Sequence, residues 1–146
     1  MTGRIAVRQL KQAISAGPIV NLLGFNGQIE GGGVMALGYT LMEDAKMIKG
    51  RYITENLDTY LIPSIRDVPF TLEVEGIEEL PEEDRFGPRG VGEIGTVAVA
   101  PAIAKAIHDA TGLWITKLPV SPETVLASLE QRSERRWKKD VNQASS

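Results

Sequence analysis

The sequence predicts one compact α+β domain with about three to four helices and a few short antiparallel strands. The chain has 146 residues, of which 42% are apolar and 24% charged. These values are typical of a soluble globular domain with its own core. Helical periodicity is clearest in residues 99–110, whereas the alternation of "FTLEV" at 70–74 indicates a strand.

The first 43 residues contain three different patterns. Residues 4–14, "RIAVRQLKQAI", fit either a strand or a helix, and the Gly, Pro and Asn of residues 15–27 predict an irregular connection. Apolar spacing in residues 28–43 predicts a helix. Three consecutive glycines at 31–33 each cost a helix roughly 1 kcal/mol relative to Ala. We therefore expect another part of the structure to pack closely against them.

The middle of the chain predicts short extended elements and loops. Residues 45–55 indicate a strand and a turn, with Lys49 and Gly50 at the bend. Residues 78–90, "EELPEEDRFGPRG", are acidic and interrupted by proline, which predicts a loop with a solvated charged surface.

The last third predicts two helices separated by an extended segment at 113–120. The first helix ends at Thr111 and Gly112, a common helix stop. Ser121 as N-cap and Pro122 at the first helical position signal the second helix. We expect a domain of residues 1–131, followed by a basic, polar and mobile tail at 132–146.

Composition excludes several classes of function. A net charge of −3 and 5% aromatic residues argue against a nucleic-acid partner. The lack of cysteine excludes disulfides and thiolate metal sites, and a single histidine makes a zinc site improbable. No apolar run reaches the ~18 residues of a membrane span, and no signal peptide is recognisable. We therefore expect a cytoplasmic protein that holds no metal through its own side chains.

Gly90, Gly92 and Gly95 spell G-x-G-x-x-G before the predicted helix. A dinucleotide fingerprint needs a buried strand directly before the glycines, and an acidic loop stands there instead. The glycines still leave backbone N–H groups open to a bulky anionic ligand. Glu93 is the single carboxylate within the motif; it either caps the helix, faces water or serves chemistry.

Three stretches together resemble the C-terminal part of the molybdopterin-binding large subunit of the xanthine dehydrogenase and aldehyde oxidase family, the molybdenum hydroxylases. They are "GQIEGGGVMALGYTLME" at 27–43, "DTYLIPSIRDVP" at 58–69 and "FGPRGVGEIGTVAVAPAIAKAIHDATGLWITKLPVSPETVL" at 86–126. The matches follow the family's order and cover most of residues 15–130. The resemblance implies that residues 1–131 are the C-terminal molybdopterin-binding domain.

The resemblance also implies roles for individual residues. Glu93 falls on the family's catalytic glutamate, the base in the hydroxylation of an aldehyde or N-heterocycle. Gly90, Val91 and Gly92 would present backbone to the cofactor, and Gln28 would lie near it. Arg89 stands where many members have lysine, so a contact with an anion is plausible there.

The chain departs from the family at Ser15, Leu22 and Asn26, where members usually have Asp, Pro and Glu. This indicates relaxed constraints or a different local fold. It also lacks the family's upstream Gly-Gly-x-Phe-Gly and Met-Gly-Gln-Gly loops and the cysteines of iron–sulfur clusters.

We therefore expect a part of an enzyme: inactive and without molybdopterin when alone, and completed by a larger molybdopterin-binding chain with iron–sulfur and flavin subunits. That partner would cover the helix face of Ile103 and Ile107 and the three glycines. Two alternatives stay open. One is a non-catalytic remnant or isolated domain that forms homo-oligomers, and the other is a small-ligand binding module that uses residues 87–95.

Overall fold

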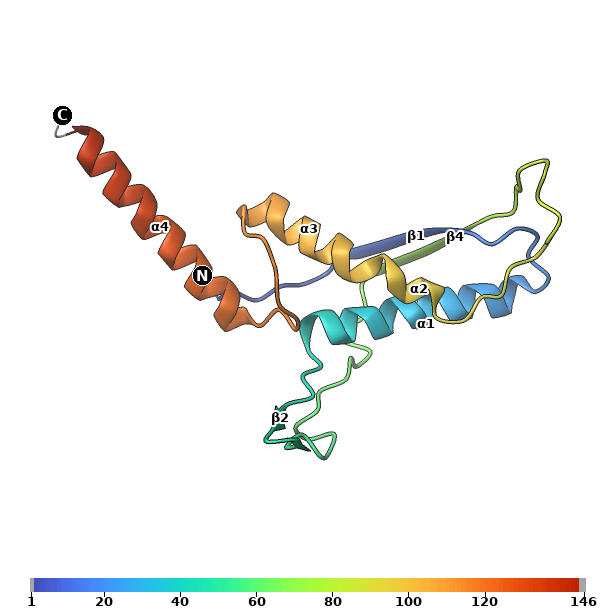
Figure 1. Cartoon of the computed structure of the whole chain (residues 1–146), viewed down its shortest axis with the longest axis horizontal. Coiled ribbons are helices and arrows are strands. Elements are labelled where there is room, and N and C mark those ends of the chain that lie inside the picture. Colours follow the sequence, from blue (N-terminus) through green and yellow to red (C-terminus); the bar gives the residue numbers. More distant parts are fainter. Residues whose placement is uncertain (1, 145–146) are drawn as a thin grey trace.

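A pair of parallel strands crossed by a long helix forms the centre of the molecule (Figure 1). The computed structural model describes residues 2–144, and the side chains of residues 2–134. Its elements are β1 (Gln9–Ser15), α1 (Leu22–Leu41), β2 (Met47–Ile48), β3 (Arg51–Tyr52), β4 (Thr71–Ile77), α2 (Ile94–Val97), α3 (Val99–Thr111) and α4 (Pro122–Ala144). The predicted α+β class is confirmed.

The two long strands pair in parallel, in a register from Gln9 opposite Thr71 to Ser15 opposite Ile77. The prediction of antiparallel strands is therefore wrong for this pair and correct only for the short β2–β3 hairpin. The physical reason is the connection: α1 carries the chain back along the sheet, so β4 starts at the same end as β1. The ambiguous N-terminal segment becomes a strand from Gln9 onward.

Helix α1 begins inside the segment that was expected to be an irregular connection. Asn21 is its N-cap, and the Asn21 side chain accepts a hydrogen bond of 2.9 Å from the Gly24 N–H. Leu22 occupies the first helical position. Because that position is one where proline is tolerated, the family's proline and this leucine fit the same backbone.

We predict that Asn21→Ala destabilises the protein by about 1 kcal/mol, because the first turn of α1 loses its side-chain acceptor. Asn21→Asp keeps an acceptor and should stay close to the parent. Urea unfolding of the three proteins measures the difference. An alanine variant as stable as the aspartate variant would show that the cap contributes nothing.

The three glycines of α1 have different surroundings. A Cβ on Gly32 would lie 3.0 Å from the Gly95 Cα, and a Cβ on Gly33 would lie 2.7 Å from Gln12 Nε2. A Cβ on Gly31 would meet nothing within 4 Å. The expected close packing is thus present at two of the three positions, where α2 crosses α1 and where β1 lies beneath it.

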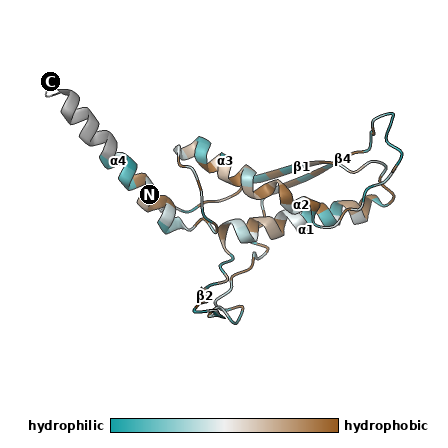
Figure 2. Cartoon of the chain, in the orientation of Figure 1, coloured by the Kyte–Doolittle hydropathy of each residue, from teal (hydrophilic) through white to brown (hydrophobic). Residues whose placement is uncertain are grey.

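Two groups of buried apolar residues hold the elements together. One group joins β1, α1, α3 and α4, and the other joins the N-terminal half of α1 to both strands, to the β1–α1 connection and to the loop before α2. Figure 2 shows hydrophobic residues on α2 and on the parts of α1 and α3 beside it. Ile103 and Ile107 belong to the first group and are each only 6% exposed. The expectation that a partner covers these two side chains is therefore wrong, because the chain's own core covers almost all of their surface, although both also line a groove between α3 and the N-terminal segment.

The segment between α1 and β4 projects from the centre as an arm, residues 43–70 (Figure 1). At its tip, Lys49 and Gly50 both have positive φ, 49° and 79°, and close the β2–β3 hairpin as predicted. Near its base, the Tyr60 hydroxyl donates a 2.6 Å hydrogen bond to Glu43. Large apolar side chains of the arm are exposed: Met47, Ile48, Tyr52, Ile53, Leu57, Leu61, Ile62, Ile65 and Phe70.

The last two helices start and stop where the sequence indicates. Gly112 ends α3 with φ at 72°, and the Ser121 hydroxyl accepts from the Thr124 N–H at 3.2 Å at the start of α4. Helix α4 continues to Ala144 instead of ending near Gln131. The proposed tail is thus helical through residue 144; its side chains from residue 135, and residues 145–146, lie outside the description. Among the described residues, no helix is long and apolar enough to cross a membrane.

Candidate cofactor-binding site

Residues 78–93 connect β4 to α2 and contain Gly90 and Gly92; we call this segment the glycine loop. It runs back from the end of β4 along the N-terminal half of α1 (Figure 1). It is anchored where it passes the end of β1, because the Arg89 N–H donates to the Ala16 carbonyl at 2.8 Å. Val91 packs against the buried side chains of Phe25 and Ile29. These two contacts fix the loop against the helix that carries Gln28.

Three of the six predicted site residues line one groove of about 330 Å³. Gln28 reaches it from α1, and Arg89 and Val91 reach it from the loop. The remaining walls come from the β1–α1 connection and the first turns of α1: Ala16, Pro18, Ile19, Val20, Asn21, Gly24, Phe25 and Pro88. The groove therefore combines apolar walls with two side-chain amides, those of Asn21 and Gln28, and the guanidinium group of Arg89.

Gly90 and Gly92 lie in the adjoining part of the loop and are exposed. Neither has a positive φ, and a Cβ on either would meet nothing within 4 Å. Neither the backbone conformation nor packing within the described chain thus requires glycine at these positions. The space beside them remains open to a ligand or to another polypeptide.

The Arg89 guanidinium forms an ion pair with Asp84 and also donates to the Gly87 carbonyl at 2.6 Å. Two of its donor groups are therefore engaged inside the loop. The sequence predicts a solvated surface for the acidic loop, and for Asp84 this prediction is wrong. Asp84 is half-buried, and its carboxylate accepts a hydrogen bond of 2.9 Å from the Phe86 N–H. The sequence signal for this turn is an aspartate two residues before an aromatic residue and five before an arginine.

The Phe86 N–H, and after it the Arg89 guanidinium, hold the pKa of Asp84 below its ordinary value. A carboxyl group with a lowered folded-state pKa stabilises the fold above its unfolded pKa of about 4. That contribution is lost as the pH falls through the lower folded value.

We predict that the Asp84 carboxyl, followed by NMR, titrates below the ordinary pKa of an aspartate in the parent protein. It should shift upward, but not fully, in Arg89→Gln, because the Phe86 hydrogen bond remains. An identical midpoint in both proteins would show that the ion pair is absent in solution.

Glu93 is exposed at the N-terminus of α2. Its backbone carbonyl accepts from the Thr96 N–H at 2.9 Å and the Thr96 hydroxyl at 2.8 Å, while its side chain does not cap the helix. The Glu93 carboxylate makes no hydrogen bond or ion pair with the described residues. Glu93 does not line the groove. The structure thus brings Gln28, Arg89 and Val91 together in the groove. The other three predicted residues, Gly90, Gly92 and Glu93, lie outside it in the adjoining chain.

Comparison with known proteins identifies this site's relatives. A family model described as a molybdopterin cofactor-binding domain matches residues 1–69. One of the subunits of a probable xanthine dehydrogenase of Bacillus subtilis is 55% identical over 137 residues, which are 94% of this chain and 18% of that protein.

Solved structures agree with the sequence relatives. Aldehyde oxidoreductase from Desulfovibrio gigas matches with a TM-score of 0.79 and 33% identity, over 88% of this chain and 14% of that one. Quinoline 2-oxidoreductase from Pseudomonas putida matches with a TM-score of 0.75 and 27% identity, over 86% of this chain and 16% of that one. The chain thus spans less than a fifth of the length of these relatives, and it corresponds in sequence and fold to a segment of the molybdenum hydroxylases, the family of xanthine dehydrogenases and aldehyde oxidases.

Proposed function

We propose that this chain supplies the catalytic glutamate and one wall of the cofactor site of an enzyme that hydroxylates an aldehyde or an N-heterocycle. The observation that carries the proposal is Glu93, an exposed carboxylate without a partner in the described chain, beside a glycine loop with open space around it. Relatives named as acting on xanthine, aldehydes and quinoline support the substrate class.

The residues present fit a bulky anionic pterin. Because a Cβ at Gly90 or Gly92 would meet only empty space, the loop backbone is accessible to a large ligand. The groove of about 330 Å³ beside it adds the Gln28 amide as a donor or acceptor. Arg89 contributes positive charge but has donors committed to Asp84 and Gly87, so its contact with the cofactor is weaker.

When bound, molybdopterin supplies the metal centre at which the substrate is oxidised. The role of this chain is proton transfer, because the oxygen nucleophile loses a proton as it attacks and a positioned carboxylate accepts it. Glu93 has the freedom for this role, since no other described side chain holds its carboxylate. Val91 and the backbone bond from Arg89 to Ala16 fix the loop that carries it.

The chain completes this site only with the remainder of the molybdopterin-binding subunit, together with iron–sulfur and flavin centres that accept the electrons. The arm supports such an assembly: nine large apolar side chains there are at least half exposed, from Ile53 at 51% to Phe70 at 105%. So many large apolar side chains exposed in one segment favour a role as a protein interface.

The same exposed arm favours a second candidate, a non-catalytic domain that self-associates through this surface. Sedimentation of the purified chain, alone and with the remaining part of the enzyme, distinguishes the two. A stable homo-oligomer that does not dissociate in favour of the larger chain supports self-association.

The proposal is tested on what we term the assembled subunit, in which this chain replaces the matching 137-residue segment of the Bacillus subtilis relative. We expect molybdenum and pterin in the assembled subunit, with turnover of aldehyde or purine, and none of these in the isolated chain. Turnover by the isolated chain, or an assembled subunit that excludes molybdopterin, contradicts the proposal.

A further inference from the structure

Residues 4–8 form an extended segment ahead of β1 that has almost no backbone partners; Gly3 before them has a φ of 65° and is not extended. Within the described part of the chain, the Arg8 carbonyl accepts from the Thr71 N–H at 3.4 Å, and the Arg4 N–H donates to the Thr2 hydroxyl at 3.4 Å. The other backbone groups of this segment have no hydrogen bond to the described residues. An extended segment without such bonds is an unused strand edge.

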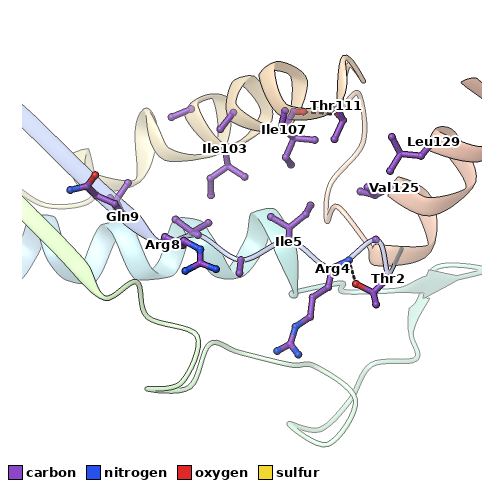
Figure 3. Close-up of a pocket in the computed structure, with 17 residues that line it drawn as sticks. Thr2, Arg4, Ile5, Arg8, Gln9, Ile103, Ile107, Thr111, Val125 and Leu129 are labelled. Atoms are coloured by element: carbon purple, nitrogen blue, oxygen red, sulfur yellow. Dashed lines mark hydrogen bonds between the residues drawn. The ribbon is translucent and has the colours of Figure 1, made fainter.

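The side chains of this segment alternate as in a strand. Ile5 and Val7 are half-buried, whereas Arg4, Ala6 and Arg8 are exposed. Figure 3 shows Ile5 on the side of Ile103 and Ile107, with the Arg4 and Arg8 side chains directed away from them. The segment therefore has the pattern of a strand that continues β1.

The sheet itself is incomplete. β4 occupies one edge of β1, and no strand of the described chain occupies the other. Sheets most often have about four to six strands, and an isolated two-stranded unit is marginally stable. The free edge of β1 and the backbone of residues 4–8 form one continuous edge without a partner strand in the described chain.

A groove of about 560 Å³ runs beside this row, between residues 2–10 and helices α3 and α4. Its walls are mostly apolar and include Ile5, Val7, Ala106, Ala110 and Leu129. α1 packs against both strands, and α3 extends over the N-terminal segment. A strand added there would direct every second side chain into the groove.

We propose that a β-strand from the remainder of the molybdopterin-binding subunit pairs with residues 4–8 and extends the β4–β1 sheet. This inference rests on the proposed function, which supplies the partner, and on the relative's length, since more than four-fifths of it lies outside the match. Arg4 and Arg8 are exposed and form no ion pair with the described residues. The added strand is therefore expected to carry acidic residues on its outward side.

Hydrogen exchange of the backbone amides tests the pairing directly. We expect the amides of residues 4–8 to exchange at least 100-fold more slowly in the assembled subunit than in the isolated chain, because they become ladder donors. Ala6→Pro removes an N–H from this row and should reduce the yield of assembled subunit at least tenfold.

Glu82→Pro is the matched control. Glu82 is the second residue of the turn closed by the Asp84 N–H on the Pro81 carbonyl, a position that favours proline, so its yield should be unchanged. An assembled subunit that binds molybdopterin but exchanges rapidly at residues 4–8 overturns the strand and leaves the proposed function standing. Slow exchange at residues 4–8 in an assembled subunit that binds no molybdopterin supports the strand pairing and contradicts the proposed function. Protection that already appears in a homodimer of the isolated chain assigns the edge to a second copy and overturns the inference.

Discussion

Glu93→Gln in the assembled subunit is expected to lower kcat by about 10²–10⁴-fold, the range that a general base contributes. Glutamine keeps the size of the side chain and removes its ability to accept a proton. Because the Glu93 carboxylate makes no hydrogen bond or ion pair with the described residues, the free energy of unfolding should change by less than about 0.5 kcal/mol. Molybdenum content per subunit should be unchanged.

Glu83→Gln is the control for the Glu93 experiment. Glu83 is an exposed carboxylate in the same loop, ten positions earlier, so it undergoes the same chemical change without a proposed role. Its kcat should match that of the parent. Full turnover by the Glu93 variant, at equal molybdenum content, would remove Glu93 as the base.

Gly95→Ala is expected to destabilise the protein by about 1–3 kcal/mol, because backbone atoms occupy the place of the new methyl group. A Cβ on Gly95 would lie 2.7 Å from the Ile29 carbonyl oxygen and 2.9 Å from the Ile29 Cα. Neither atom belongs to a flexible side chain, so α2 must move away from α1. Glu93, two residues before Gly95, would move with it, and kcat of the assembled subunit should fall.

Gly31→Ala is the matched control for Gly95→Ala, and both variants are measured in the isolated chain. Gly31 also lies within a helix, but its Cβ would meet nothing within 4 Å. The change should therefore stabilise α1 by about 0.5–1 kcal/mol through helix propensity alone. Urea unfolding compares the two variants with the parent. Equal effects would show that the contact between α1 and α2 is looser than the structure describes.

Local signals predicted those elements whose ends are fixed by single residues. Gly112 ends α3 and Ser121 starts α4, because a left-handed stop and an N-cap hydroxyl act within one turn. The bend at Lys49 and Gly50 is equally local. Each of these features requires only the chain within a few residues of it.

Pairings between distant segments could not be predicted in the same way. The parallel pairing of β1 with β4 depends on the path of α1 and of the arm between them. The ion pair between Asp84 and Arg89 depends on a turn at Phe86 within a loop whose composition indicates only solvated surface. Ile103 and Ile107 illustrate the opposite error, because an apolar face assigned to a partner is covered by the chain itself.

The resemblance of motifs predicts the site residues, and the structure places three of them in one groove. Gln28, Arg89 and Val91 share a groove because the loop is bonded to the end of β1 and lies against α1. Glu93 lies beside that groove at the start of α2, and its relation to a cofactor depends on chain outside the described residues. No spacing in the sequence carries that information.

The central claim is that Glu93 faces the reacting centre of a bound cofactor. It is tested most directly by a crystal structure of the assembled, cofactor-loaded subunit with a substrate analogue. We expect the Glu93 carboxylate within about 2.6–3.2 Å of the oxygen that it deprotonates, or one bridging water away, and the backbone of Gly90–Gly92 against the pterin. A Glu93 carboxylate directed into solvent, with another carboxylate at the metal centre, would contradict the account.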